Sequence, residues 1–219
     1  MTDMSDTLLL VFEIFGTIAF AASGAMTGLS KKMDIFGVVT LGIVTSVGGG
    51  VIRDLVLGNT PPATFSNPVY ALVATVVSIV LFIPAVRRFL LRNQRLYDKA
   101  MFVMDSVGLG IFTVVGIETA YLADKSNVFL LLFVGMVTGI GGGVLRDVLA
   151  GNTPYIFIKH FYASASLIGA VVCIGIWEFF KRPGIAMLAG SLCILVLRFL
   201  AARFRWSLPK AEDIEKTNK

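Results

Sequence analysis

The stretch GGGVIRD at residues 48–54 places three glycines, an arginine and an aspartate inside a long apolar segment. Residues 141–147 repeat it as GGGVLRD, and both copies continue to Gly-Asn-Thr-Pro, at residues 58–61 and 151–154. The register is constant, because 93 positions separate Gly48 from Gly141 (141 − 48) and Arg53 from Arg146 (146 − 53). The chain therefore contains an internal duplication. The Gly-Asn-Thr-Pro tail is a helix stop and turn signal in each copy.

The composition predicts an integral membrane protein. Of the 219 residues, 56% are hydrophobic and 15% are charged, and the mean hydropathy is +0.84. A soluble domain does not need so much apolar surface to form one core. In such a protein the net charge of +5 reflects topology and does not indicate nucleic-acid binding.

Nothing in the sequence predicts an enzyme. It has no phosphate-binding loop, no Ser-His-Asp or Cys-His arrangement and no metal-ligand spacing. Cys173 and Cys193 lie in apolar runs and are expected to be small buried hydrophobes, and His160 is expected at the membrane interface. We therefore expect no cofactor and no metal.

Seven apolar segments approach the length of about 20 residues that a helix needs to cross a bilayer core. They are residues 8–29, 35–58, 68–91, 100–122, 128–150, 160–180 and 184–204. We expect one all-α membrane domain over residues 1–219. It comprises a first repeat (8–91), a second repeat (100–180), a seventh helix without a counterpart (184–204) and a polar tail (206–219).

The basic residues predict the topology. If all seven segments span, one face carries most of the Lys and Arg residues outside the spans, from Lys31 to Lys219, and the other carries only Lys125, Lys181 and Arg182. The positive-inside rule then places the N-terminus outside and the C-terminus in the cytoplasm. Because each repeat has three spans, the second copy is expected to be inverted relative to the first. The match extends to the first helix of each repeat, where three residues recur 92 positions later (105 − 13): Glu13, Gly16 and Phe20 correspond to Asp105, Gly108 and Phe112.

The glycine triplets are expected to disturb the second and fifth helices. Each glycine costs about 1 kcal/mol relative to alanine in a helix interior, so a triplet weakens its helix by about 3 kcal/mol. We predict kinked or unwound helices at Gly48, Gly49, Gly50, Gly141, Gly142 and Gly143. The half-helix ends there would offer partial charges to a ligand near the midplane. The alternative is that small residues simply let membrane helices pack closely.

Charged residues inside spans are costly and therefore suggest pathway or pairing roles. Arg53 and Glu13 lie at the same depth, about 7 to 8 Å below one face at 1.5 Å per residue, and Arg146 and Asp105 share the corresponding depth below the other. We predict the salt bridges Glu13–Arg53 and Asp105–Arg146, one at each mouth of a pathway.

The remaining intramembrane acids, Asp54 and Asp147, directly follow the arginines and are expected to face away from them. These six groups comprise four acids and two bases, which favours a cation over an anion. Arg198, in the seventh helix, is expected to snorkel or to bridge protomers.

Four hydroxyl residues near the triplets are candidates for lining a hydrated path: Ser23, Thr45, Ser46 and Thr138. For each, the alternative is a hydrogen bond to the helix carbonyl one turn earlier. The basic run at residues 87–99 is expected at the cytoplasmic surface, in contact with anionic lipid.

At the doubled motif, GGGVIRDLVLGNTPP and GGGVLRDVLAGNTPY, the chain resembles the prokaryotic members of the trimeric intracellular cation (TRIC) channel family, to which sequences described as glycine transporters are related. The resemblance covers roughly residues 8–204. It implies a homotrimer in a bacterial or archaeal plasma membrane, with a pore in each seven-helix protomer that conducts potassium and, less selectively, sodium. It also implies functional roles for the triplet glycines and for Arg53, Asp54, Arg146 and Asp147.

The first functional hypothesis is therefore a passive, potassium-permeable cation channel. The alternative is a secondary transporter of a small amino acid such as glycine, since inverted repeats with broken helices also occur in transporters. A third is a structural membrane protein whose glycines serve only packing. No filter sequence like that of potassium channels is present, so ion selectivity does not follow from the residues.

Overall fold

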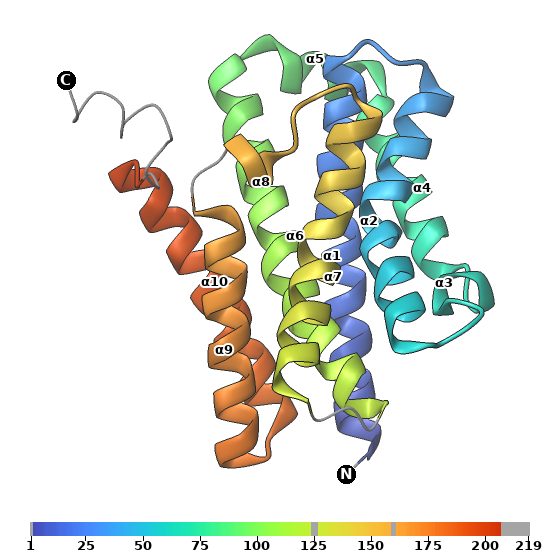
Figure 1. The fold of residues 1–219 in the computed structure, drawn as a ribbon. Coiled ribbons are helices and arrows are strands. Elements are labelled where there is room, and N and C mark those ends of the chain that lie inside the picture. Colours follow the sequence, from blue (N-terminus) through green and yellow to red (C-terminus); the bar gives the residue numbers. More distant parts are fainter. Residues whose placement is uncertain (1, 124–126, 159–160, 207–219) are drawn as a thin grey trace, which may run out of the picture.

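The computed structural model describes residues 2–123, 127–158 and 161–206, and all the regular structure in these ranges is helical. Lys125, Lys159, His160 and the tail beyond Trp206 lie outside the described residues. The helices, drawn in Figure 1, are α1 (Thr2–Ser30), α2 (Ile35–Leu57), α3 (Ala63–Ser66), α4 (Val69–Phe82), α5 (Pro84–Arg92), α6 (Gln94–Leu122), α7 (Val128–Leu149), α8 (Tyr155–Ile158), α9 (Tyr162–Phe180) and α10 (Pro183–Phe204).

Six of these helices are long and apolar enough to cross a membrane: α1, α2, α6, α7, α9 and α10. The expected third span, residues 68–91, is not one straight helix, because α4 and α5 meet at an angle of 72°. Pro84 causes the bend, since a residue before proline disfavours the helical region and Ile83 is extended (φ −52°, ψ 131°). By length and composition, the described residues thus provide six helices that could each cross a membrane, or seven candidates if the bent pair counts as one.

The helix order repeats along the chain. Two long helices, a four-residue helix and a further helix form α1–α4, and the same series recurs as α6–α9. In Figure 1, α1 rises from the N-terminus whereas α6 descends, and the following helices alternate in direction. α5 connects the two series, and α10 follows them without a counterpart in the first.

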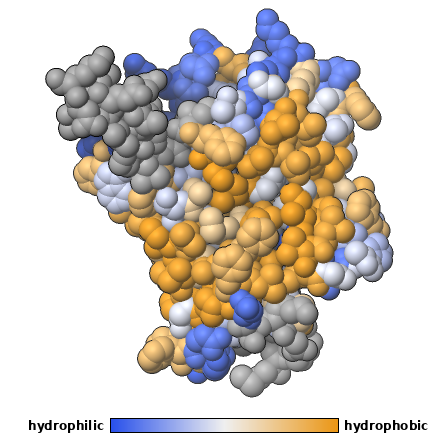
Figure 2. All heavy atoms as spheres, viewed as in Figure 1, coloured by the Kyte–Doolittle hydropathy of each residue, from blue (hydrophilic) through white to orange (hydrophobic). Residues whose placement is uncertain are grey.

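The centre of the molecule is formed by the first two helices of each series. α1, α2, α6 and α7 contact one another, while α4 packs on α1 and α2, and α9 packs on α6, α7 and α10. The face shown in Figure 2 has a broad apolar band between two polar ends. This distribution suits a protein whose middle contacts lipid, because lipid tails require an apolar surface of that height.

The glycine triplets lie within unbroken helix. α2 and α7 are α-helical throughout residues 48–50 and 141–143, so the predicted unwinding is wrong and a kink there is not confirmed. A Cβ atom on Gly49 would collide with the carbonyl oxygen of Thr138, and one on Gly142 would collide with that of Thr45. The two backbones touch at this crossing, so the glycines are needed for close packing. This packing stabilises both helices and offsets the low helix propensity of the glycine triplets.

Both central helices end as the Gly-Asn-Thr-Pro tail predicts. Gly58 and Gly151 adopt left-handed conformations, with φ of 80° and 66°. The amides of Asn59 and Asn152 donate to the carbonyls of Asp54 and Asp147, each at 2.8 Å. This C-terminal cap ends each helix directly after its Arg-Asp pair and turns the chain back toward that pair.

Candidate functional site

Each repeat contains the same local ion pair. Arg53 Nε lies 2.8 Å from Asp54 Oδ1, and Arg146 Nε lies 2.9 Å from Asp147 Oδ1. The prediction that these aspartates face away from their arginines is therefore wrong. Each arginine guanidinium lies near the glycine one turn earlier, Gly50 or Gly143, and its Nε contacts the carboxylate of the next residue.

The second oxygen of each of these aspartates holds the loop that follows. Asp54 Oδ2 accepts a hydrogen bond from the Ala63 amide, and Asp147 Oδ2 accepts one from the Tyr155 amide, both at 2.9 Å. Asp54 and Asp147 are almost fully buried. Each aspartate thus orients its arginine and anchors the start of α3 or α8.

In the second repeat the arginine also forms an ion pair with the acid in the first helix of that repeat, α6. Arg146 Nη1 lies 2.8 Å from Asp105 Oδ1, and neither side chain is exposed. The same nitrogen donates to the Ser23 hydroxyl on α1, and the Tyr162 hydroxyl donates to Asp105 Oδ1 at 3.4 Å. The predicted Asp105–Arg146 pair is therefore present, as the centre of a cluster that joins α1, α6, α7 and α9.

Arg198 belongs to this cluster. Its side chain is buried, its Nε donates to the Ser106 hydroxyl at 3.3 Å, and its Nη2 lies 3.8 Å from Asp105 Oδ2. The expectation that Arg198 snorkels or bridges protomers is wrong. An acid on the neighbouring helix α6 compensates its charge, so the side chain does not need to reach water or a second protomer.

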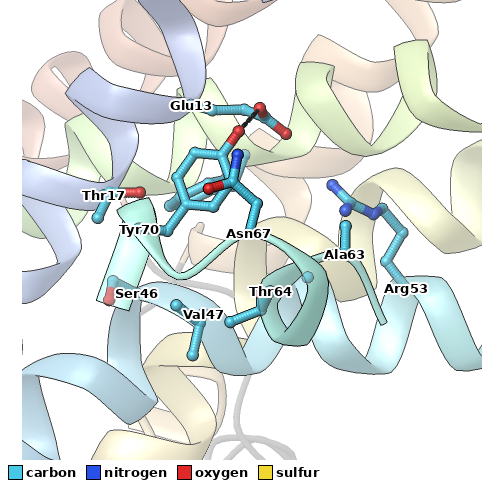
Figure 3. Close-up of a pocket in the computed structure, with 11 residues that line it drawn as sticks. Glu13, Thr17, Ser46, Val47, Arg53, Ala63, Thr64, Asn67 and Tyr70 are labelled. Atoms are coloured by element: carbon cyan, nitrogen blue, oxygen red, sulfur yellow. Dashed lines mark hydrogen bonds between the residues drawn. The ribbon is translucent and has the colours of Figure 1, made fainter. Parts of the chain in front are cut away.

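The first repeat has the same groups in a different arrangement. Glu13 forms no ion pair with Arg53 in the described structure and instead accepts a hydrogen bond from the Tyr70 hydroxyl. Figure 3 shows Glu13 and Tyr70 on one side of a cavity and Arg53 on another. The predicted Glu13–Arg53 bridge is therefore wrong for this structure, because the tyrosine takes the carboxylate and the cavity lies between the two charged groups.

This cavity has a volume of about 160 Å³ and opens to the exterior. Besides the charged residues, polar groups from α1, α2, α3 and α4 line it, including Thr17, Ser46, Thr64 and Asn67. One water needs about 10–15 Å³ of such volume, so the cavity has room for several waters or for a partly hydrated ion.

A pair of aromatic rings lies beside the cavity. Phe112 lines it, and Phe20 contacts Phe112 in a tilted arrangement, with ring centroids 5.3 Å apart and an interplanar angle of 36°. Gly16 and Gly108 make room for these rings, since a Cβ on Gly16 would lie 3.1 Å from the Phe112 ring and one on Gly108 would collide with Phe20. The rings close the apolar centre of the molecule beside the α2–α7 crossing.

The four hydroxyl candidates separate into three groups. Ser46 lines the cavity while donating to the Ile43 carbonyl at 3.0 Å. Thr45 and Thr138 are buried and donate to the carbonyls one turn earlier, at 2.5 and 2.6 Å, as the alternative interpretation held. Ser23 lies in the Arg146 cluster. Only Ser46 among the four therefore contacts the described cavity.

Sequence reasoning missed Tyr70 and Tyr162. Each donates to the acid of its own repeat, and in both cases the tyrosine lies 57 residues after the acid. Extending the comparison of the two copies past the Gly-Asn-Thr-Pro tail would have found them. Among the described residues, no group of three or more His, Cys, Asp or Glu side chains is arranged to hold a metal.

The fold and the doubled Arg-Asp unit define a polytopic helical membrane protein. A family model described as Glycine transporter matches residues 10–85 and 102–178, one stretch in each repeat, and the chain belongs to this family. It is 37% identical to the UPF0126 inner membrane protein YadS of Escherichia coli K12 over 199 residues, which cover 90% of this chain and 93% of the relative.

Solved channel structures are also similar. The TRIC trimeric intracellular cation channel orthologue from Rhodobacter sphaeroides is 34% identical with a TM-score of 0.83, and the match covers 91% of this chain and 100% of that one. A TRIC cation channel whose structure addresses conductance is 35% identical with a TM-score of 0.79, covering 91% and 95%. The resemblance to the TRIC family is thereby confirmed.

Proposed function

We propose that this protein is a monovalent cation channel through which potassium, and less selectively sodium, passes passively. Two kinds of observation support this. The similar solved structures are cation channels by name, at 34% and 35% identity over most of the chain. The open cavity is lined by one acid, Glu13, and one base, Arg53; because Asp54 outside the lining already pairs with Arg53 at 2.8 Å, the three groups together carry a net negative charge that attracts cations.

The pathway runs within one protomer, from the cavity past the Phe20–Phe112 rings to the Arg146 cluster. The two Arg-Asp units are its gates. In the first repeat the acid is held away from the arginine and water has access, whereas in the second the equivalent acid and arginine are bridged and buried. This difference supports a pathway that is open at one mouth and closed at the other.

The two halves form inverted repeats within a single membrane domain. The repeated helix series and the reciprocal contacts at the α2–α7 crossing support this, because Gly49 faces Thr138 just as Gly142 faces Thr45. With Lys31, Lys32 and the α5 arginines on the cytoplasmic side, the open cavity faces outside and the closed gate faces the cytoplasm. We place the protein in a bacterial or archaeal plasma membrane, as a homotrimer like the related channels.

Anionic lipid is the expected contact of α5 and the first turn of α6. Arg88, Arg92 and Arg95 are exposed there, and Arg87 lies over the Phe82 ring at 5.4 Å. A surface helix with this charge lies naturally at the head-group level. In this proposal α5 holds the cytoplasmic end of the bundle at the membrane surface.

The single observation that carries the channel proposal is that Glu13 lines a water-accessible cavity in the first repeat, whereas the equivalent Asp105 is buried in an ion pair in the second. The test is single-channel recording of the purified protein in planar bilayers with potassium chloride, with and without millimolar glycine. We expect discrete openings that are independent of glycine and reverse at the cation equilibrium potential.

Glu13→Gln is expected to lower the potassium conductance several-fold by removing the cavity's negative charge. The matched control is Glu178→Gln, since Glu178 is an exposed acid of α9 outside the cavity. Equal conductance in the Glu13→Gln variant and the wild type would refute the assigned path.

Glycine transport is the second candidate, and one observation favours it. Glu13 and Arg53 face the same cavity without binding each other, so they match the ammonium and carboxylate of an amino-acid zwitterion. If this candidate is correct, proteoliposomes accumulate labelled glycine saturably, Arg53→Met abolishes uptake, and no unitary currents appear. The absence of both uptake and current would instead leave the glycines with a packing role alone.

A further inference from the structure

The carboxylate of Asp105 has two oxygens with different partners. Oδ1 accepts hydrogen bonds from Arg146 and Tyr162, whereas Oδ2 is buried and makes no hydrogen bond, although Arg198 Nη2 lies 3.8 Å away. A buried charged oxygen without a hydrogen bond is unfavourable. If the Arg198 guanidinium moved slightly closer, it would donate a hydrogen bond to Oδ2.

Contacts on several sides hold Arg198 at this distance. Its guanidinium lies 4.7 Å from the centre of the Tyr162 ring and 5.0 Å from that of Phe102, and its Nε donates to Ser106. Aromatic faces attract a guanidinium but let it slide, since the cation–π interaction has no fixed donor–acceptor geometry. Arg198 is therefore positioned beside Asp105 without being fully engaged by it.

The two gates differ in which groups can stabilise the carboxylate once it has separated from its arginine. In the first repeat, the Tyr70 hydroxyl and the cavity accommodate Glu13. In the second, Asp105 is fully buried, and separating it from Arg146 alone would leave an unpaired buried charge, which is strongly destabilising. α10 has no counterpart in the first repeat, so Arg198 supplies a second cation to this gate only.

We propose that Arg198 takes over Asp105 when Arg146 leaves it, and that this exchange of partners makes opening of the second gate possible. Arg198 is thus a positioning residue that stabilises the open state relative to the closed one. The inference rests on the proposed function, in which separation of Arg146 from Asp105 opens the pathway.

The test is the open probability of Arg198→Met in single-channel recordings of the full chain. Because a hydrogen bond to a charged group changes an equilibrium by about tenfold or more, we expect the open probability to fall about tenfold. Arg198→Lys keeps the positive charge, so its open probability is expected to fall less. The matched control is Arg203→Met, which removes an exposed arginine from the last turn of the same helix and should leave the recording unchanged.

A double-mutant cycle with Asp105→Asn separates this role from general packing. If Arg198 acts through Asp105, Arg198→Met has no further effect on open probability in the Asp105→Asn background. An increase in open probability in Arg198→Met, or an equal decrease with and without Asp105, would overturn the inference.

A labelling experiment decides the inference independently of conduction. A cysteine is placed at Thr17, which lines the open cavity, in a chain with Cys173 and Cys193 replaced by alanine. A charged thiol reagent added on the Arg146 side must pass the second gate and then the Phe20–Phe112 rings to reach it, so its labelling requires the second gate to open. Arg198→Met should slow this labelling about tenfold. Unchanged labelling overturns the inference, while a wild-type protein without current refutes only the channel function.

Discussion

Replacing Gly49 with alanine is expected to force α2 and α7 apart at the point where they cross. The added Cβ would collide with the Thr138 carbonyl oxygen and would lie 3.2 Å from the Thr138 carbonyl carbon and 3.4 Å from the Gly142 amide nitrogen. All three are backbone atoms, so no side-chain rotation relieves the contact. The helices have to separate to admit the methyl group.

Two opposing terms set the magnitude. Overpacking costs about 1–3 kcal/mol, and the upper end applies because the obstacle is backbone. Alanine recovers about 1 kcal/mol of helix propensity relative to glycine. The net destabilisation is about 2 kcal/mol, which corresponds to a fall in Tm of about 4–8 °C for a chain of this size.

Thermal unfolding of the purified protein in detergent measures this change, and Gly175→Ala is the matched control. Gly175 lies in α9, and a methyl group added there would meet no atom within 4 Å. Alanine at this position should therefore leave Tm unchanged or raise it, because it improves helix propensity without a clash.

Gly142→Ala meets the Thr45 carbonyl in the reciprocal contact and should resemble Gly49→Ala. The double variant should lose less than the sum of the two, because one separation of the helices admits both methyl groups. A Gly49→Ala protein as stable as Gly175→Ala would refute the proposed crossing.

Three further predictions test the site and its supports. Arg146→Met removes the ion-pair partner of both Asp105 and Asp147 and should cost about 3–5 kcal/mol even where Arg198 approaches Asp105, whereas Arg53→Met removes the partner of Asp54 alone, beside the open cavity, and should cost clearly less; equal shifts in Tm would contradict the difference between the two gates. Tyr70→Phe removes the donor that holds the Glu13 carboxylate and lets it pair with Arg53, so open probability should fall about tenfold in single-channel recordings, and an unchanged value would exclude this role of the tyrosine. Asp34→Ala removes the side-chain cap that accepts from the Gly37 amide at 2.7 Å and should lower stability by about 1 kcal/mol in the same unfolding assay, without altering conductance.

Several features of this molecule follow from local sequence alone. Mean hydropathy and segment length predicted the membrane class and the long spans, because a bilayer imposes its thickness on every helix. The Gly-Asn-Thr-Pro tails predicted the ends of α2 and α7, because a left-handed cap favours glycine, which has no Cβ to strain that conformation. The Asp105–Arg146 pair was predicted because the two residues lie at equal depth in the membrane. That depth follows directly from residue number and the helix rise per residue.

Other features depended on which surfaces meet. Glycine propensity predicted an unwound helix, but the close contact of Gly49 and Gly142 with the opposite backbone stabilises both helices in continuous form. Arg198 has no repeat partner and no local motif, so only the packing of α10 against α6 shows that it lies beside Asp105. The bend at Pro84 turned an apparent third span into two helices.

By itself the sequence determined the duplication, the membrane class and the inventory of charged groups, since these depend on residue type, spacing and hydrophobic length. Only the tertiary structure decided that one acid pairs with its arginine while the equivalent acid binds a tyrosine beside a cavity. The physical reason is that both copies carry the same partners within reach. Which pair forms depends on small differences in packing and hydration between the two ends of the molecule, and no local pattern encodes them.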